Sequence, residues 1–183
     1  FICGGEESFG FMTGDFVRDK DSCGSILTAC EIAAWCKANG TTVYQYMIDI
    51  YKEVGLYYEG LINVVRKGRS GAEEIQEMMK NFRENPPKEI AGSLVEEVKD
   101  FQEQTCFVVS KNEKKVMDDI PKSNVLIYYT QDGTKVCVRP SGTEPKIKFY
   151  VSVKDSIVSE QDFVEKLPKL EEKINKVKQD LNL

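Results

Sequence analysis

The feature that most constrains this fold is a seven-residue loop between two short β-strands. Residues 146–153 alternate between apolar and polar side chains, and residues 134–138 form a second strand candidate. The run Arg-Pro-Ser-Gly-Thr-Glu-Pro at 139–145 connects them. Strands so close along the chain favour an antiparallel pair, with this loop at one end of the sheet.

The 139–145 loop has the composition of an anion-binding site. Arg139 can bind a phosphate through two parallel hydrogen bonds, and the hydroxyls of Ser141 and Thr143 can donate others. Gly142 leaves the backbone N–H groups accessible, and the two prolines restrict the loop before a ligand binds. On spacing alone, an ordinary polar loop with one arginine remains an equal interpretation.

Two motifs resemble the α-D-phosphohexomutases, the phosphoglucomutase and phosphomannomutase family. Members carry an Arg-x-Ser-Gly-Thr-Glu-Pro loop before a basic strand, which here is Lys-Ile-Lys-Phe-Tyr at 146–150. Residues 5–10, Gly-Glu-Glu-Ser-Phe-Gly, resemble the sugar-recognition loop of that family. A weaker likeness is the Arg-Asp-Lys-Asp run at 18–21 before a predicted helix. The order of these motifs along the chain argues against coincidence.

The resemblance implies roles for individual residues. Four loop residues would hold the substrate phosphate that is not being transferred: Arg139, Ser141, Gly142 and Thr143. Lys148 would contact the same phosphate, in preference to Lys146, which shares its face of the strand. Glu144 is expected to pair with Arg139 or Lys146 and to orient it.

The resemblance also implies a sugar-binding site near the N-terminus. Glu6 would accept and Ser8 would donate hydrogen bonds to adjacent sugar hydroxyls. Lys20 would add a positive charge toward the phosphate, or instead pair with Asp19 or Asp21 on the surface.

Residues that the chemistry of the family requires are missing. The chain has no histidine, which excludes the Thr-Ala-Ser-His-Asn-Pro type loop of the phosphorylated serine, and it has no Asp-Gly-Asp-x-Asp-Arg loop for Mg²⁺. Since Phe1 stands in what resembles the end of a buried strand, we expect the C-terminal part of a four-domain mutase. Residues 1–56 would end the third domain and residues 57–183 would form the fourth. No catalytic or metal-binding residue is expected here.

The complete enzyme would interconvert hexose 1-phosphate and hexose 6-phosphate through an intermediate of the glucose 1,6-bisphosphate type. Its Mg²⁺ and its serine would belong to the missing N-terminal domains of the same chain, so this piece alone should be inactive. Glucose phosphate is the first choice of substrate, and a phosphopentomutase parent remains open. So do a stand-alone phosphosugar-binding module and a nucleic-acid platform formed by Lys146, Lys148 and Tyr150.

Composition favours a globular protein of the cytoplasm. Of 183 residues, 41% are hydrophobic and 30% are charged, and the net charge of −5 argues against nucleic-acid binding. No apolar run has the length of a membrane span. The six cysteines form no Cys-x-x-Cys pair and have no histidine partner, which argues against zinc and favours reduced, mostly buried thiols.

Hydrophobic periodicity divides the chain into two parts. In the first, Ser22 would begin a helix that buries Ile26 and Leu27 and ends at Asn39-Gly40. A capping box at 42–45 would begin a second helix ending at Gly55, and both would cover the third domain's sheet. Residues 58–65 are predicted to be an extended connector, with Gly55 and Gly60 as hinges that let the two sites close on a ligand.

The second part alternates between helix and strand patterns. A capping box of Ser70 and Glu73 predicts a helix that Asn85-Pro86-Pro87 ends, and the last helix would be kinked or restarted at Pro168. The strand candidates are 94–101, 124–129, 134–138 and 146–153, with a turn at Asp132-Gly133. The expected class is α+β: a four-stranded, mainly antiparallel sheet packed by helices, preceded by the α/β remnant of the third domain.

Overall fold

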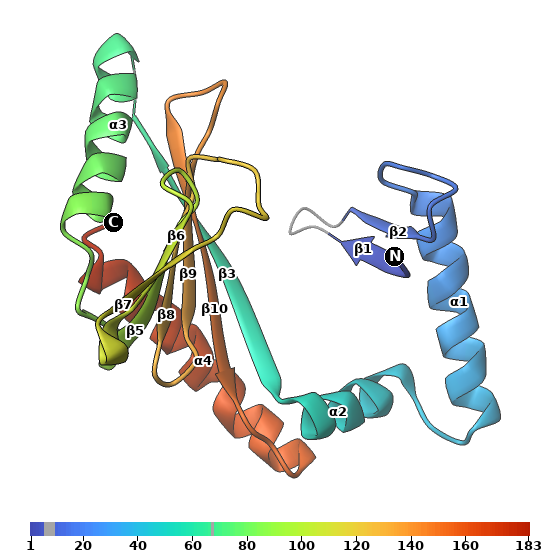
Figure 1. The fold of residues 1–183 in the computed structure, drawn as a ribbon. Coiled ribbons are helices and arrows are strands. Elements are labelled where there is room, and N and C mark those ends of the chain that lie inside the picture. The colour runs from blue at the N-terminus through green and yellow to red at the C-terminus, as the bar shows by residue number, and fades with distance from the viewer. Residues whose placement is uncertain (6–9, 67) are drawn as a thin grey trace. The chain divides into compact units, whose positions relative to one another are not determined.

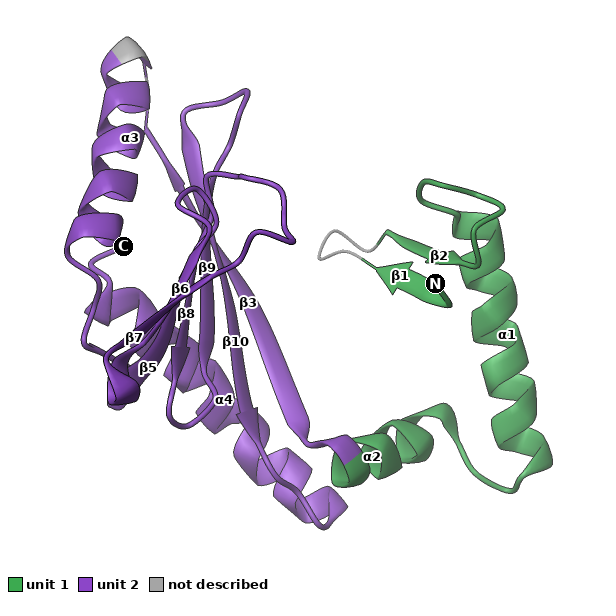
Figure 2. Cartoon of the chain, viewed as in Figure 1, with its two compact units in different colours: residues 1–53 green, residues 54–183 purple. Residues whose placement is uncertain are grey.

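The computed structural model describes residues 1–5, 10–66 and 68–183 (Figure 1). The chain forms two compact units, unit 1 at Phe1–Glu53 and unit 2 at Val54–Leu183 (Figure 2). The assignment of residues 1–56 and 57–183 to two domains of a mutase stays a prediction.

Unit 1 begins with a small antiparallel pair of strands. β1 (Cys3–Gly5) pairs with β2 (Phe11–Thr13), so that Gly4 lies opposite Met12. The prediction of a buried first strand is wrong, because Phe1 and Ile2 are 75% and 87% exposed.

Two helices follow, α1 (Ser22–Ala38) and α2 (Val43–Val54). The cap of α1 is Asp21, whose carboxylate accepts a hydrogen bond from the Gly24 N–H at 3.0 Å, so the predicted Ser22 cap is wrong by one residue. The cap of α2 is Thr42 as predicted, and its hydroxyl accepts from the Gln45 N–H at 3.1 Å. The Gln45 side chain donates to Asp49 at 3.2 Å, which leaves the capping box half formed.

The predicted burial of the α1 face is wrong. Ile26 is 65% exposed and Leu27 is 61% exposed, and the apolar residues of α1 are spread around the helix instead of lying on one face. Trp35 of α1 contacts Tyr46 of α2, with ring centroids 5.0 Å apart. The two short strands give these helices too little surface to cover.

Unit 2 is an antiparallel sheet with helices on one face. In the part of the chain that the structure describes, the sheet has eight strands in the order β3-β10-β9-β8-β5-β6-β7, with β4 added beside β5. The strands are β3 (Leu56–Val65), β4 (Glu89–Ile90), β5 (Ser93–Asp100), β6 (Thr105–Val108), β7 (Glu113–Val116), β8 (Leu126–Thr130), β9 (Lys135–Pro140) and β10 (Lys146–Asp155). A short 3₁₀ turn, η1 (Val109–Lys111), joins β6 to β7.

The two helices of unit 2 pack on the face of the sheet that Phe149 and Val151 share. From α3 (Gly68–Glu84), the Phe82 ring lies 5.5 Å from the Phe149 ring, edge to face. From α4 (Glu160–Asp180), Ile174 lies over Gly60, which pairs with Val151. Phe149 and Val151 are at most 1% exposed, so the core lies between this face and the helices.

The α+β class is confirmed, and the predicted number of strands is too small. The segment predicted as a connector is β3, which pairs with β10 along its whole length. Gly60 is therefore no hinge, because it lies inside a paired strand beneath Ile174. The short strands β4, β6 and β7 carry too little alternation to stand out in the sequence.

The start of α3 and the course of α4 differ from the prediction. α3 begins at Gly68, so Ser70 lies in its first turn and is not a cap. It ends at Glu84, before the predicted Asn-Pro-Pro run. α4 continues through Pro168 without a restart, and Ser159 caps it by accepting from the Asp162 N–H at 3.1 Å.

The turn between β8 and β9 has the predicted chemistry. Gly133 has φ +81°, a left-handed conformation that favours glycine. Asp132 accepts hydrogen bonds from the hydroxyls of Thr130 at 2.6 Å and Thr134 at 2.9 Å, and Lys173 of α4 pairs with it at 2.6 Å. The turn is thereby tied to α4.

All six cysteines are free, but they are not mostly buried as predicted. Cys36 and Cys106 are buried and Cys137 is half-buried, whereas Cys3, Cys23 and Cys30 are exposed. Among the described helices, none combines the length and the apolar character that a membrane crossing requires.

Candidate functional site

The 139–145 loop is closed by backbone hydrogen bonds at its base. The Ser141 N–H donates to the Lys146 carbonyl at 2.7 Å, where β9 and β10 meet. The Ser141 hydroxyl accepts from the N–H groups of Thr143 at 3.4 Å and Glu144 at 3.3 Å, and its oxygen lies 3.5 Å from the Thr143 hydroxyl. The two predicted hydroxyls therefore lie together at one side of the loop.

Gly142 stands at the exposed tip of the loop. Its φ is not in the left-handed region, and a Cβ built there would meet no atom of the described residues within 4 Å. Neither backbone strain nor packing within the chain thus requires glycine at this position. The open space is what an approaching ligand needs.

The strand register places two predicted cations side by side. Lys148 of β10 is the direct partner of Arg139 of β9, so both project from the face opposite to Phe149. Like charges at directly opposed positions of an antiparallel pair destabilise the sheet. An anion bound between the two side chains would remove that cost.

Glu144 pairs with Lys146, one of the two partners expected for it. Its carboxylate lies 2.9 Å from the Lys146 ammonium. The hydrogen bond from Lys146 lowers the pKa of the exposed Glu144 carboxyl, with help from the charges of Lys146 and Lys148. Lys148, and not Lys146, is the strand lysine directly opposite Arg139.

The half-buried thiol of Cys137 lies two residues before Arg139 on the same face of β9. Burial raises its pKa, against the opposing charges of Lys135 and Arg139. The thiol therefore stays neutral near pH 7 and adds no negative charge near the loop.

For the basic run 66–69, which contains Arg66, the sequence favours a solvated turn, with steering of phosphate as the alternative, and the fold brings Arg66 beside the loop. Its backbone N–H donates to the Pro145 carbonyl at 2.9 Å, and its guanidinium pairs with Glu74 of α3 at 3.2 Å. Its sequence signal is its place in the basic run 66–69, a pattern that is typical of a solvated turn. Arg66 adds positive charge near the loop and anchors it to β3.

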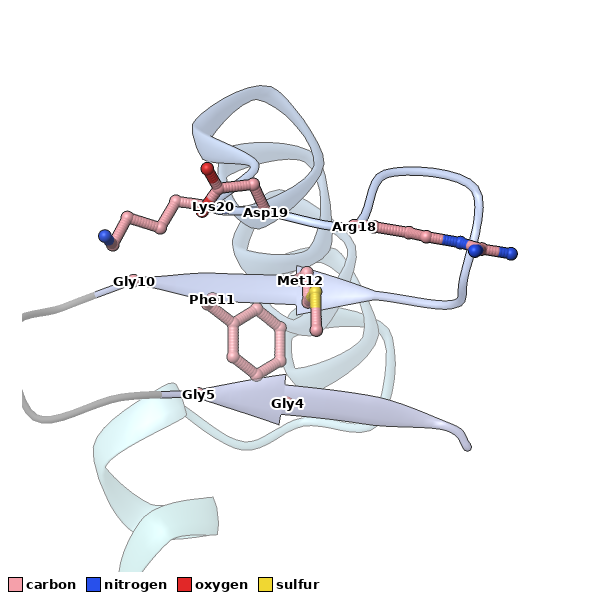
Figure 3. A pocket seen from close by; sticks show the side chains of 8 residues that line it. All are labelled: Gly4, Gly5, Gly10, Phe11, Met12, Arg18, Asp19 and Lys20. Atoms are coloured by element: carbon pink, nitrogen blue, oxygen red, sulfur yellow. Dashed lines mark hydrogen bonds between the residues drawn. The ribbon is translucent and has the colours of Figure 1, made fainter.

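A second candidate site lies in unit 1, where a pocket of about 250 Å³ opens beside the β1–β2 pair. It is lined by Gly4, Gly5, Gly10, Phe11, Met12, Arg18, Asp19 and Lys20 (Figure 3). In Figure 3 the Lys20 side chain extends toward Gly10, whereas Arg18 extends the other way. The structure thus brings Lys20 to the two glycines that flank the predicted sugar-binding loop.

Glu6 and Ser8, the predicted sugar-binding residues, lie outside the described residues. Gly5 and Gly10, on either side of them, both line the pocket of unit 1. The backbone N–H of Lys20 donates to the Asp19 carboxylate at 2.7 Å, a local contact within the segment before α1.

Across residues 1–5, 10–66 and 68–183, no group of three or more His, Cys, Asp or Glu side chains is placed to hold a metal ion.

Comparison with known proteins gives the same family for both units. The C-terminal domain of phosphoglucomutase/phosphomannomutase matches residues 61–169. The alpha/beta/alpha domain III of phosphoglucomutase/phosphomannomutase matches residues 1–54.

Relatives are longer than this chain. A phosphoglucomutase of Staphylococcus aureus (strain MRSA252) is 38% identical over 149 residues, which are 81% of this chain and 27% of that protein. The phosphoglucomutase of strain MSSA476 is 37% identical over the same shares. Among solved structures, the open form of pp63/parafusin, a phosphoglucomutase from Paramecium, is 19% identical with a TM-score of 0.48, covering 95% of this chain and 30% of that one.

Proposed function

Because this chain belongs to the phosphoglucomutase/phosphomannomutase family, we propose that it supplies the sugar- and phosphate-binding part of a hexose-phosphate mutase. The parent enzyme interconverts hexose 1-phosphate and hexose 6-phosphate by phosphoryl transfer. In this role unit 2 belongs to the fourth domain and unit 1 to the end of the third.

The observation that carries the proposal is the direct pairing of Arg139 with Lys148 at the base of the 139–145 loop. Two adjacent positive charges, two hydroxyls and an open glycine tip form a site for one phosphate. Arg139 and Lys148 neutralise its charge, and Ser141 and Thr143 donate hydrogen bonds to its oxygens. These contacts recognise the anion and not the sugar carbon that bears it.

Such a site suits a mutase, whose bisphosphate intermediate must turn over within one pocket. The loop holds whichever phosphate is not reacting, first in one orientation of the sugar and then in the other. Glu6 and Ser8 bind the sugar hydroxyls in both orientations, and Lys20 adds a positive charge beside them. The serine and the Mg²⁺ that carry out phosphoryl transfer belong to other parts of the parent protein, so this chain alone is inactive.

Glucose phosphate is the proposed substrate, because the Gly-Glu-Glu-Ser-Phe-Gly run resembles phosphoglucomutases and phosphopentomutases more than bacterial phosphomannomutases. The partners of the chain are the remaining domains of the parent, which the exposed apolar face of α1 would contact. The six free thiols suit the reducing cytoplasm as its location.

The test is a titration of this chain with inorganic phosphate. Arg139→Met should weaken binding by about 2–3 kcal/mol, the value of a lost charge-assisted contact. Lys135→Met is the matched control, since it removes one charge from the same face of the same strand, at the end away from the loop. Equal, small effects of both changes would show that the loop is structural and would overturn the proposal.

A second experiment addresses the missing chemistry. The purified chain, supplied with glucose 1-phosphate, Mg²⁺ and a hexose bisphosphate, should form no glucose 6-phosphate. Measurable conversion would mean that a phosphoryl carrier exists within these residues.

A further inference from the structure

The Lys148 side chain has an aromatic neighbour that the phosphate-binding proposal does not use. Its Nζ lies 5.7 Å from the centroid of the Tyr150 ring, within the range of a cation–π interaction. Both residues are on β10 and two positions apart, so they share the face of the sheet opposite to Phe149. The ring lies on the side of Lys148 away from the loop.

The contact between Lys148 and Tyr150 bears on the phosphate site because Lys148 lies directly opposite Arg139. Two like charges at opposed positions repel each other, and a long lysine side chain lowers that repulsion by rotating away. A tyrosine ring under the ammonium opposes such rotation, because its face attracts the cation. The Tyr150 ring is half-buried, which fixes it in place more firmly than an exposed side chain.

We propose that Tyr150 is a positioning residue of the phosphate site, whose ring holds the Lys148 ammonium beside Arg139 before the anion binds. The inference rests on the proposed phosphate-binding function of the 139–145 loop. It goes beyond that function by assigning a role to a residue outside the loop. Pre-ordered cations bind an anion more tightly, since less side-chain entropy is lost on binding.

The same face of the sheet offers a matched control. Lys99 lies 5.1 Å from the centroid of the Tyr129 ring, so this pair has the same chemistry as Lys148 and Tyr150. Lys99 also lies 3.0 Å from Glu97, and neither Lys99 nor Tyr129 belongs to β9 or β10. Loss of the Tyr129 ring therefore tests for a general effect of removing an aromatic from this face.

The experiment measures the dissociation constant of the whole chain for inorganic phosphate, followed by NMR through the amide signal of Gly142. Tyr150→Leu should weaken binding roughly threefold, the effect expected from an exposed cation–π contact. Tyr150→Phe should retain the affinity, because the ring is kept. Tyr129→Leu should leave the affinity unchanged. Circular dichroism of each variant checks that the sheet is folded.

A double-mutant cycle decides whether Tyr150 acts through Lys148. In a Lys148→Met background, Tyr150→Leu should cause no further loss of phosphate affinity. A loss that persists in that background, a loss with Tyr150→Phe equal to that with Tyr150→Leu, or an equal loss with Tyr129→Leu would each overturn the inference.

The same affinity measurements distinguish a failure of the phosphate-binding proposal from a failure of the Tyr150 proposal. If Arg139→Met leaves the phosphate affinity unchanged, the loop does not bind the anion and both proposals fail. If Arg139→Met and Lys148→Met weaken binding but Tyr150→Leu does not, only the positioning role of Tyr150 fails.

Discussion

The two units of this chain contain helices with large apolar side chains and bury those side chains to very different extents. In unit 2, Leu170 and Val177 of α4 are 4% and 0% exposed, because a broad antiparallel sheet lies against them. In unit 1, Ile26 and Leu27 of α1 remain more than half exposed beside two strands of three residues each. The apolar residues of α4 lie along one face, whereas those of α1 are spread around the helix, so only the α4 pattern marks a face that the sheet covers.

The largest effect should come from the core of unit 2. Phe149→Ala removes a fully buried ring that contacts Phe82, and it should lower the free energy of unfolding by about 3–5 kcal/mol. Urea unfolding followed by circular dichroism measures this change. A loss below about 1 kcal/mol would mean that the sheet and α3 are not packed as described.

The matched change in unit 1 is Leu27→Ala. Since Leu27 is 61% exposed, its truncation should change stability by less than about 0.5 kcal/mol. Trp35 is the single tryptophan, so its fluorescence follows unit 1 selectively. A cost as large as that of Phe149→Ala would show that the α1 face is covered within this chain, and the contrast between the units would be wrong.

The next prediction tests whether β3 packs against α4 at Gly60. A Cβ at Gly60 would lie 2.9 Å from the Ile174 side chain, so Gly60→Ala should cost about 1–3 kcal/mol through overpacking against α4. Combining it with Ile174→Val should recover part of the loss, because the smaller side chain makes room. If Gly60→Ala is neutral, β3 is not held beneath α4, and the predicted hinge at Gly60 regains support.

A smaller effect, with a pH signature, is expected at Asp132. Burial raises the pKa of its carboxyl, but the hydrogen bonds from Lys173, Thr130 and Thr134 outweigh burial and hold the pKa well below its ordinary range. A depressed pKa in the folded state stabilises the fold above the ordinary carboxyl pKa near 4, and this stabilisation is lost as the pH falls toward the folded pKa.

Asp132→Asn should therefore cost on the order of 1 kcal/mol at pH 7, since the ion pair with Lys173 is lost. The difference in unfolding free energy between the two proteins should stay constant above about pH 5 and shrink below about pH 4. Urea unfolding from pH 3 to pH 8 measures it. A difference that does not depend on pH would mean that the charge of Asp132 plays no part.

Most of unit 2 could be predicted from the sequence, because its main strands carry strict alternation and its turn carries an Asp-Gly pair. The prediction failed at β3, where glycines at 55 and 60 suggested hinges. Gly60 is there because Ile174, more than a hundred residues away, leaves no space for a Cβ. Such long-range packing has no local signal in the sequence.

In the candidate site, too, local features could be predicted from the sequence and long-range ones could not. The composition of the 139–145 loop predicts an anion-binding site, which stays a prediction, and the pairing of Glu144 with Lys146 is confirmed at 2.9 Å. The direct pairing of Arg139 with Lys148, and the position of Arg66 beside Pro145, depend on strand register and on the return of β3 along β10. Register is a property of two strands together, so neither strand alone reveals it.

The smallest expected effect on stability is at Gly142, and it separates fold from function. A Cβ there meets no atom of the described residues within 4 Å and the backbone is not left-handed, so Gly142→Ala should change the unfolding free energy by less than about 0.5 kcal/mol. If the loop tip faces a phosphate, the same methyl group lies in the path of the anion and should weaken phosphate binding at least several-fold. Gly60→Ala is the converse control, since it should destabilise the fold without touching the loop. Unchanged affinity in Gly142→Ala, with Arg139→Met still defective, would place the anion on the strand cations and away from the tip.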